Sequence, residues 1–340
     1  MVRRVKLKRA VLIERVHSRE SIAKQLMSRP NAFIPTGCTV LDRAMGNGYP
    51  LGRVTNIVGD KSTGKTLLAI EALANFHRLY PNGHMRYKEA ESAFDVPYAE
   101  SLGFPVDAVT IDDTGNTVED LHETIVDMTS KCNGDPGILI VDSLDALTDK
   151  AEMGRKIGEN SYGTSKAAQL SQMFRRTITP IANANLAVII ISQVRDNIGV
   201  TFGRKTKRSG GRALDFYASL VIYLAEIRKR VSVVNKVSRV TGVDILAKID
   251  KNKIAAPFRE AGTTITFGYG MENVESCIRY LESVKHEHVL RELGLPSKIT
   301  QRDIKKVRDD PEFEAELIER VNEVWDDIET WFSTKRNKYR

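Results

Sequence analysis

Long hydrophobic runs are absent from this sequence, and other features that would define a class of protein are scarce. No stretch of eighteen apolar residues occurs, so we expect no membrane-spanning helix and no association with a membrane. The chain has three cysteines, Cys38, Cys132 and Cys277, and their spacing fits neither a disulfide framework nor a metal cluster. The basic N-terminus lacks the apolar core and cleavage site of a secretion signal. We therefore expect a cytoplasmic protein.

Internal repeats and low-complexity tracts are also missing. Hydrophobic residues make up 41% of the chain and charged residues 28%, as in an ordinary globular protein. The net charge is +7, and positive charge is concentrated in the first ten residues, between 195 and 212, and in the last six residues. Because segment 303–329 is acidic by contrast, the distribution favours distinct charged faces, one of which could bind a polyanion.

The middle of the chain alternates short apolar runs with helical patterns. Strands are expected at 54–58, 138–141, 186–192, 220–225, 244–249 and 263–267, and helices at about 65–80, 118–132 and 164–178. The runs ILIV and LAVIII are apolar throughout, which is typical of strands covered on both faces. The pattern predicts an α/β fold with a mostly parallel central sheet. Short connections between the later strands indicate an antiparallel edge.

Three regions are expected along the chain. Residues 1–33 form an N-terminal segment, with a helix over 18–27 that Pro30 terminates. Residues 34–270 carry the α/β core. From about 271 to 340 the sequence becomes helical and charged, which predicts a small α-rich C-terminal domain.

The segment "VTNIVGDKSTGKTLLAIEAL" carries the most specific motif, G-x-x-x-x-G-K-[ST]. A strand pattern precedes it and a helical pattern follows, which is the context that a phosphate-binding loop requires. Its glycines let backbone N–H groups surround phosphates at a helix N-terminus. The alternative is a glycine-rich turn with a surface lysine. The predicted ATP-binding residues here are Gly59, Asp60, Lys61, Ser62, Thr63, Gly64, Lys65, Thr66 and Leu67.

Asp142 follows four apolar residues in "ILIVDS", so its carboxylate is expected at the carboxyl edge of the sheet beside the phosphate-binding loop. Together with the Thr66 hydroxyl, it is predicted to hold Mg²⁺, with Asp142 acting through water. The alternative is an aspartate that merely caps a loop.

Hydrolysis also needs a group that orients water, and "KEAESAFD" offers Glu89, Glu91 and Asp95. The pattern alone does not choose between the two glutamates. Gln193, which ends the apolar run in "IIISQVR", could hydrogen-bond a γ-phosphate or could be a polar strand terminus. A basic, glycine-rich stretch, "FGRKTKRSGGR", begins soon after it. By itself such a charge run is most often a solvated loop.

The chain resembles the RecA recombinases from about residue 19 to about residue 280. The resemblance rests on "GDKSTGKT", "EAESAFDVPYAESLG", "ILIVDSLDALTDKAEM", "SQVRDNIGVTFG", "SGGRALDFYAS" and "KNKIAAPFREA", in family order. It implies a RecA-like P-loop ATPase core with ATP and Mg²⁺ as ligands. By resemblance, Glu91 activates water, Gln193 senses the γ-phosphate, and Lys65 contacts the phosphates. Asp95 and Tyr98 lie beside the adenine.

The resemblance also implies self-association into a helical filament with ATP between protomers. Lys251 and Lys253 match family residues that reach a neighbour's ATP and stabilise charge in trans. Phe216 resembles the family's interface residue, although its own sequence pattern indicates core.

Two DNA-binding loops are implied as well, near 154–163 and 195–212, which would bind single-stranded and double-stranded DNA. Ile198 matches an apolar residue that inserts between bases, while cations and backbone amides hold phosphates. The predicted DNA-binding residues are Tyr162, Gly163, Ser171, Arg175, Arg195, Ile198, Arg204, Lys205, Lys207, Arg208, Ser209, Gly210, Gly211 and Arg212.

The function predicted from these motifs is a DNA-dependent ATPase that forms filaments on single-stranded DNA and catalyses homologous pairing and strand exchange in recombination and repair. One alternative is a hexameric helicase motor with the same core. Another is a regulatory module that assembles on DNA without strand exchange.

Overall fold

The computed structural model describes residues 32–132, 134–154, 164–196, 206–208, 211–334 and 336. The part Phe33–Arg340 forms one compact unit. The helix expected over 18–27 lies outside the described residues. Among the residues described, no helix combines the length and the apolar character needed to cross a bilayer.

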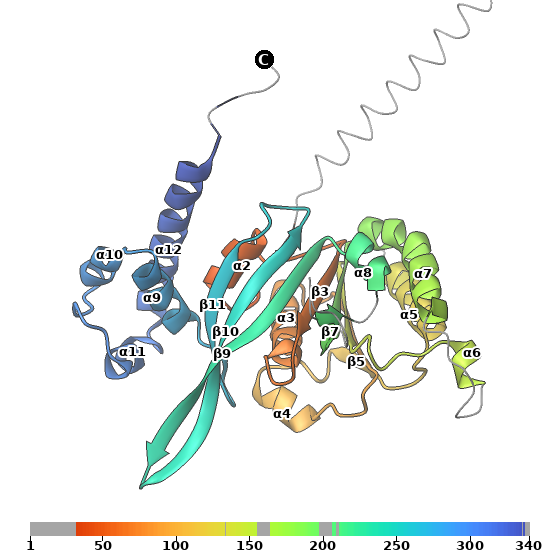
Figure 1. Ribbon diagram of the computed structural model, residues 1–340, viewed down its shortest axis with the longest axis horizontal. Helices are drawn as coiled ribbons and strands as arrows, with labels where there is room; N and C mark the ends of the chain where they lie inside the picture. Colours follow the sequence, from red (N-terminus) through yellow and green to blue (C-terminus); the bar gives the residue numbers. More distant parts are fainter. Residues whose placement is uncertain are drawn as a thin grey trace, which may run out of the picture. The chain divides into compact units, whose positions relative to one another are not determined.

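Within the described residues, ten strands form one mixed sheet in the order β12-β11-β10-β9-β3-β7-β6-β4-β5, with β8 paired to β7 (Figure 1). They are β3 (Val54–Gly59), β4 (His84–Glu89), β5 (Val109–Asp112), β6 (Gly137–Asp142), β7 (Leu186–Asp196), β8 (Thr206–Arg208), β9 (Leu220–Val234), β10 (Val237–Asn252), β11 (Glu260–Thr266) and β12 (Gly270–Met271). A separate pair consists of β1 (Phe33–Ile34) and β2 (Tyr49–Pro50).

The sheet changes from parallel to antiparallel along its width. The pairings β9–β3, β3–β7, β7–β6, β6–β4 and β4–β5 are parallel. The pairings β9–β10, β10–β11 and β11–β12 are antiparallel. The predicted α/β class, with a mostly parallel sheet and an antiparallel edge, is therefore confirmed. The distal parts of β9 and β10 project beyond the sheet as a two-stranded ribbon (Figure 1).

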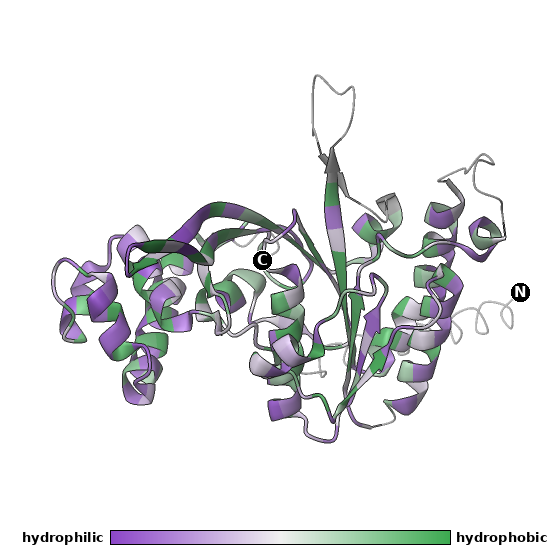
Figure 2. Ribbon diagram, turned by 90° about the horizontal axis from the view of Figure 1, so that it is seen from below, coloured by the Kyte–Doolittle hydropathy of each residue, from purple (hydrophilic) through white to green (hydrophobic). Residues whose placement is uncertain are grey.

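Helices cover both faces of the sheet, and each face has its own hydrophobic core. In chain order they are α2 (Thr39–Met45), α3 (Lys65–Leu79), α4 (Val96–Ser101), α5 (Val118–Lys131), α6 (Lys150–Met153), α7 (Thr164–Asn183), α8 (Gly211–Tyr217), α9 (Asn273–Ser283), α10 (Glu287–Glu292), α11 (Gln301–Val307) and α12 (Pro311–Phe332). One core contains α2, α3, α9 and α12, and the other contains α5, α7 and α8. Figure 2 shows the hydrophobic strands enclosed between more polar helices.

Local sequence explains where several helices begin. Thr117 caps α5, because its side chain accepts the N–H of Asp120 while Asp120 accepts the N–H of Thr117. Asp310 caps α12 by accepting the N–H groups of Glu312 and Phe313, and Pro311 occupies the first helical position. These caps satisfy backbone donors that have no partner inside the helix.

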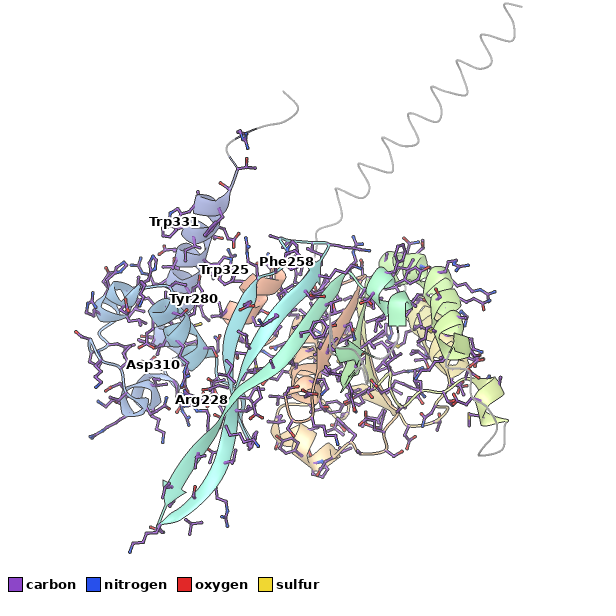
Figure 3. The ribbon with its side chains drawn as sticks, viewed as in Figure 1. Arg228, Phe258, Tyr280, Asp310, Trp325 and Trp331 are labelled. Carbon is purple, nitrogen blue, oxygen red and sulfur yellow. The ribbon has the colours of Figure 1, made fainter. Side chains whose placement is uncertain are left out.

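The C-terminal helices pack against the antiparallel edge of the sheet. Tyr280 of α9 and Trp325 of α12 have ring centroids 5.3 Å apart (Figure 3). Trp325 and Leu317 are buried in the same core as Ile265 of β11. This shared core links the helices that follow residue 272 to the sheet that precedes it.

Strands β4 and β5 were not predicted. The sequence of β4, HMRYKE, alternates polar and apolar residues, yet it lies inside the sheet between β5 and β6. Lys88 is only 1% exposed and forms a 3.1 Å ion pair with Asp112 on β5. A buried cation paired across two strands cannot be recognised from hydrophobic periodicity, because its partner is distant in sequence.

Candidate functional site

The loop between β3 and α3 has the geometry of a phosphate cradle. Gly64 ends the loop with a φ of 86°, a left-handed conformation that glycine adopts without strain. A Cβ at this position would collide with Cδ1 of Ile265, so the loop approaches β11 only because residue 64 is glycine. Since α3 begins at Lys65, the unpaired N–H groups of its first turn border the loop.

Lys65 lies beside this cradle. Its Nζ donates a hydrogen bond of 2.5 Å to the carbonyl oxygen of Asp60. Burial lowers the pKa of Lys65, and the carboxylates of Asp142 and Asp60 offset part of that decrease. The residue thus supplies a cation at the entrance of the predicted ATP site.

Asp142 and Thr66 meet at the carboxyl edge of the sheet. The Thr66 hydroxyl donates to Oδ2 of Asp142 at 2.8 Å, and the Tyr87 hydroxyl donates to the same oxygen at 2.7 Å. Burial raises the pKa of Asp142, while these two hydrogen bonds oppose the increase. A hydroxyl beside a carboxylate is an oxygen donor set that fits Mg²⁺. Tyr87 was missed, because it lies on β4.

Glu91 and Gln193 also lie together. Gln193 Nε2 donates to Glu91 Oε1 at 3.1 Å, and the Ser143 hydroxyl donates to the same oxygen. The backbone N–H of Gln193 donates to Asp145 Oδ2 at 2.8 Å. Two donors from different segments of the chain therefore converge on the Glu91 carboxylate. Ser143 and Asp145 were not singled out, although both belong to the quoted segment "ILIVDSLDAL".

The sequence pattern does not choose between Glu89 and Glu91 as the residue that orients water. In the structure the two glutamates have different surroundings. Glu89 is 6% exposed, and its Oε1 accepts the N–H groups of Glu91 at 2.8 Å and Ala93 at 3.3 Å. Its carboxylate therefore organises the loop that carries Glu91. Glu91 itself is exposed, so its carboxylate is open to solvent beside Gln193.

A cavity of about 370 Å³ adjoins the phosphate-binding loop. It is lined by Ser62, Thr63, Gly64, Lys65, Thr66, Leu67, Ile70, Ala93, Phe94, Asp95, Tyr98, Val243, Ile265 and Phe267. Asp95 caps α4 by accepting the N–H of Tyr98 at 3.0 Å, which fixes both predicted residues at the cavity. Val243, Ile265 and Phe267 were missed, because only the antiparallel return of β10 and β11 brings them to this loop.

Lys251, Lys253 and Phe216 form a separate surface group. Lys251 Nζ donates to the carbonyl oxygens of Asp215 at 2.5 Å and Phe216 at 3.0 Å. Lys253 Nζ donates to the Phe216 carbonyl at 3.3 Å and lies 5.8 Å from its ring centroid. The core assignment of Phe216 from its own pattern is wrong, because its side chain is 70% exposed. It lies near the end of α8, whose buried face is instead formed by Ala213 and Leu214.

Two of the predicted DNA-binding residues are fully described. Ser171 and Arg175 lie one turn apart on α7, and Arg175 is exposed. Outside the described residues lie Tyr162, Gly163, Ile198, Arg204, Lys205, Ser209 and Gly210. For Arg195 in β7, Lys207 and Arg208 in β8, and Gly211 and Arg212 in α8, the structure describes the backbone.

The strand expected over 186–192 is longer than predicted and ends at Asp196. The backbone of Arg195 pairs with that of Lys207, and Val194 pairs with Arg208, so the two ends of the segment 195–212 form an antiparallel ribbon. The apolar strand that precedes Gln193 continues to Asp196 through these backbone hydrogen bonds, which periodicity does not detect.

Comparison with known proteins defines the family. The model of the RecA N-terminal domain matches residues 6–272. The chain belongs to the RecA family. Protein RecA of Porphyromonas gingivalis is 36% identical over 301 residues, covering 86% of this chain and 85% of the relative. Protein RecA of Colwellia psychrerythraea is 38% identical over 260 residues, covering 75% and 71%. The RecA protein of Thermus thermophilus is 36% identical over 248 residues, covering 72% and 70%. The residues matched by the family model include the large sheet and the phosphate-binding loop described above.

Proposed function

We propose that this protein is an ATP-dependent recombinase that assembles on single-stranded DNA and catalyses homologous pairing and strand exchange. The observation that carries the proposal is the position of Gln193. Its side chain bonds Glu91 beside the phosphate cradle, and the same strand leads directly into the basic segment 195–212. One strand thus connects a residue able to contact a γ-phosphate with a cationic segment able to bind DNA.

In this proposal the cradle binds ATP, with the triphosphate at the N-terminus of α3 and the base in the 370 Å³ cavity. Thr66 and Asp142 would hold Mg²⁺, the latter through water. When bound, the ion neutralises charge on the β and γ phosphates. Lys65 adds a fixed cation to the same phosphates. Membership of the RecA family supports this assignment.

Glu91 is the proposed general base. Its carboxylate accepts a proton from water while the water oxygen bonds to the γ-phosphorus. The bond between that phosphorus and the bridging oxygen breaks, and ADP leaves with the electron pair. Gln193 would exchange its bond to Glu91 for one to the γ-phosphate, so the presence of ATP would change the position of β7 and its basic continuation.

The remaining residues act between protomers and on DNA. Lys251 and Lys253, supplied by a neighbouring copy, would stabilise the negative charge of the transferred phosphate. Exposed Phe216 would lie in the same contact. Ser171, Arg175 and the basic segment would bind the DNA backbone, with both single-stranded and double-stranded DNA as partners. The buried, free Cys38, Cys132 and Cys277 support a reducing, cytoplasmic setting.

The test is ATP hydrolysis with and without single-stranded DNA, alongside Lys65→Ala. We expect DNA to raise kcat at least tenfold in the wild type, and the variant to lose activity in both conditions. Transfer of a labelled strand from a homologous duplex follows, with a heterologous duplex as control. Equal ATPase rates with and without DNA would refute a recombinase. DNA-stimulated hydrolysis without strand transfer would instead support the regulatory module, and duplex unwinding would support the helicase motor.

A further inference from the structure

We propose that Lys166, in the first turn of α7, is a positioning residue that ties the DNA-binding side of the protein to the hydrolytic pair Glu91–Gln193. This inference rests on the proposed function and concerns the regulation of the same site. Neither the phosphate-binding motif nor the DNA-binding residues predicted from the sequence include Lys166.

The ammonium group of Lys166 contacts the turn 143–147. Its Nζ donates to the carbonyl oxygens of Leu144 at 2.9 Å and Asp145 at 3.4 Å, and to that of Leu147. An ammonium group has three donors and no acceptor, so it can bond several carbonyl oxygens at once. Lys166 therefore ties the turn 143–147 to α7 through several hydrogen bonds.

The same turn contacts the hydrolytic pair from its other side. Ser143 donates its hydroxyl proton to Oε1 of Glu91, and Asp145 accepts the backbone N–H of Gln193 at 2.8 Å. Lys166 also donates a hydrogen bond to the backbone carbonyl oxygen of Asp145. A rotation of that peptide unit would move the carboxylate that holds Gln193, so the geometry of Gln193 and Glu91 depends on Lys166.

The location of Lys166 is unfavourable for a lysine with no specific task. The N-terminus of a helix carries partial positive charge, and a cation in its first turn is electrostatically disfavoured. The first turn of α7 contains no acidic residue. The carbonyl oxygens of 144, 145 and 147 offset this cost by surrounding the ammonium group.

Helix α7 also carries two of the proposed DNA contacts. It begins at Thr164, immediately after the first proposed DNA-binding loop, and it carries Ser171 and Arg175. DNA bound there would act on the N-terminal turn of α7, and Lys166 would convert a shift of that turn into a shift of the turn 143–147. The inferred result is that DNA sets the position of Glu91 relative to water.

The test compares wild type with Lys166→Met, which keeps an unbranched apolar side chain but removes the three donors. ATP hydrolysis is titrated with single-stranded DNA, giving kcat at saturating DNA, the half-saturating DNA concentration and the KM for ATP. We expect the stimulation of kcat by DNA to fall about tenfold, with half-saturation and KM changed less than about twofold. Lys166→Arg should recover part of the stimulation, because it keeps the charge but presents its donors in a planar fork. Arg176→Met, an exposed cation on the same helix, is the matched control.

Amide hydrogen exchange gives a second, independent readout on the wild type. Binding of DNA should change the protection of the Gln193 N–H, and Lys166→Met should abolish that change. Unaltered stimulation in the variant, or unchanged Gln193 exchange when DNA binds, would overturn the inference. A loss that excess DNA restores would also overturn it and would make Lys166 a DNA ligand. Failure of the proposed function is distinguishable, because the wild type would then show no stimulation at all.

Discussion

Gln193 and Glu91 are 102 positions apart in the sequence, yet Nε2 of the first donates to Oε1 of the second at 3.1 Å. The Ser143 hydroxyl donates to the same oxygen, so this carboxylate is held by two donors from neighbouring strand ends. In the proposed ATP-bound state Gln193 turns to the γ-phosphate, and the Ser143 hydroxyl is the donor that still holds the Glu91 carboxylate in position.

Replacement of the Glu91 carboxylate should lower the rate of ATP hydrolysis while leaving the affinity for ATP nearly unchanged. We expect Glu91→Gln to lower kcat for ATP hydrolysis by roughly 10²–10⁴-fold, the usual contribution of a general base. Affinity for ATP, measured with a fluorescent nucleotide, should change little because the cradle is intact. Glu100→Gln, an exposed glutamate on α4, is the control. A Glu91→Gln variant that hydrolyses ATP normally would assign the base elsewhere.

The exposed ring of Phe216 should contribute to self-association. Phe216→Ala is expected to raise the concentration needed for assembly about 5- to 30-fold, since loss of a buried interface aromatic costs on the order of 1–2 kcal/mol. Sedimentation in the presence of ATP and DNA measures this. Phe332→Ala on α12 is a matched control, because that ring is 77% exposed and Phe216 is 70% exposed. Equal assembly by the two variants would contradict an interface role for Phe216.

Glu71 should make stability depend on pH. Burial raises its pKa to about 7, although the Met271 N–H, which donates at 2.7 Å, opposes the increase. The folded protein keeps this proton at pH values where the unfolded chain has released it. The stabilising contribution is therefore complete below the ordinary value of 4.5 and is lost as the pH rises through about 7.

The matching experiment compares urea unfolding of wild type and Glu71→Gln between pH 4.5 and 8. Relative to the variant, the wild type should lose on the order of 2 kcal/mol of unfolding free energy over this range. Parallel curves for the two proteins would show that Glu71 titrates normally.

Asp244 should hold the C-terminal helices against the sheet. It accepts hydrogen bonds from Arg228 at 2.5 Å, Thr264 at 2.9 Å and Arg279 of α9 at 3.2 Å. Burial alone would raise the pKa of Asp244, but the bonds from Arg228 and Thr264 outweigh it and keep the pKa below its ordinary value. Its contribution is present above that ordinary value and is lost as the pH falls through the lowered pKa.

We expect Asp244→Asn to destabilise the protein by about 2–4 kcal/mol at neutral pH, because the arginines lose a buried counter-charge. Chemical denaturation measures the loss. Asp250→Asn, on the same strand, is the comparison and should cost less. If the two variants are equally stable, the cluster of Asp244 with Arg228 and Arg279 makes no net contribution to the free energy of unfolding.

Much of the nucleotide site could be predicted from the sequence, because its parts are local motifs. Lys65 and Thr66 follow directly from the phosphate-binding motif, and Asp142 follows from the end of an apolar strand. Contacts between segments that are distant in the sequence could not be predicted from the sequence. Tyr87 contacts Asp142 from a strand with no hydrophobic pattern, and Val243 reaches the cavity through an antiparallel return. Such contacts depend on sheet order, which one sequence does not encode as a period.

For Phe216 the local sequence pattern predicts the wrong location. An aromatic residue among apolar neighbours indicates core, and only the geometry of α8 shows that its ring faces solvent. The family resemblance instead implies an interface residue. Interface and core residues share the same apolar chemistry, so the sequence pattern does not separate the two.

The length of β10 has an evolutionary consequence. Val243 on this strand lines the nucleotide cavity, and its neighbour Asp244 accepts hydrogen bonds from Arg228 and Arg279. Lys251 lies near the end of the same strand. Inserting one residue between them would exchange the two faces of the strand and displace every contact at once. The ribbon turn at Asn235 and Lys236 is exposed and bounded by no such contacts among the residues described. Related chains should therefore differ in length at the ribbon tip and conserve the spacing from Val243 to Lys251.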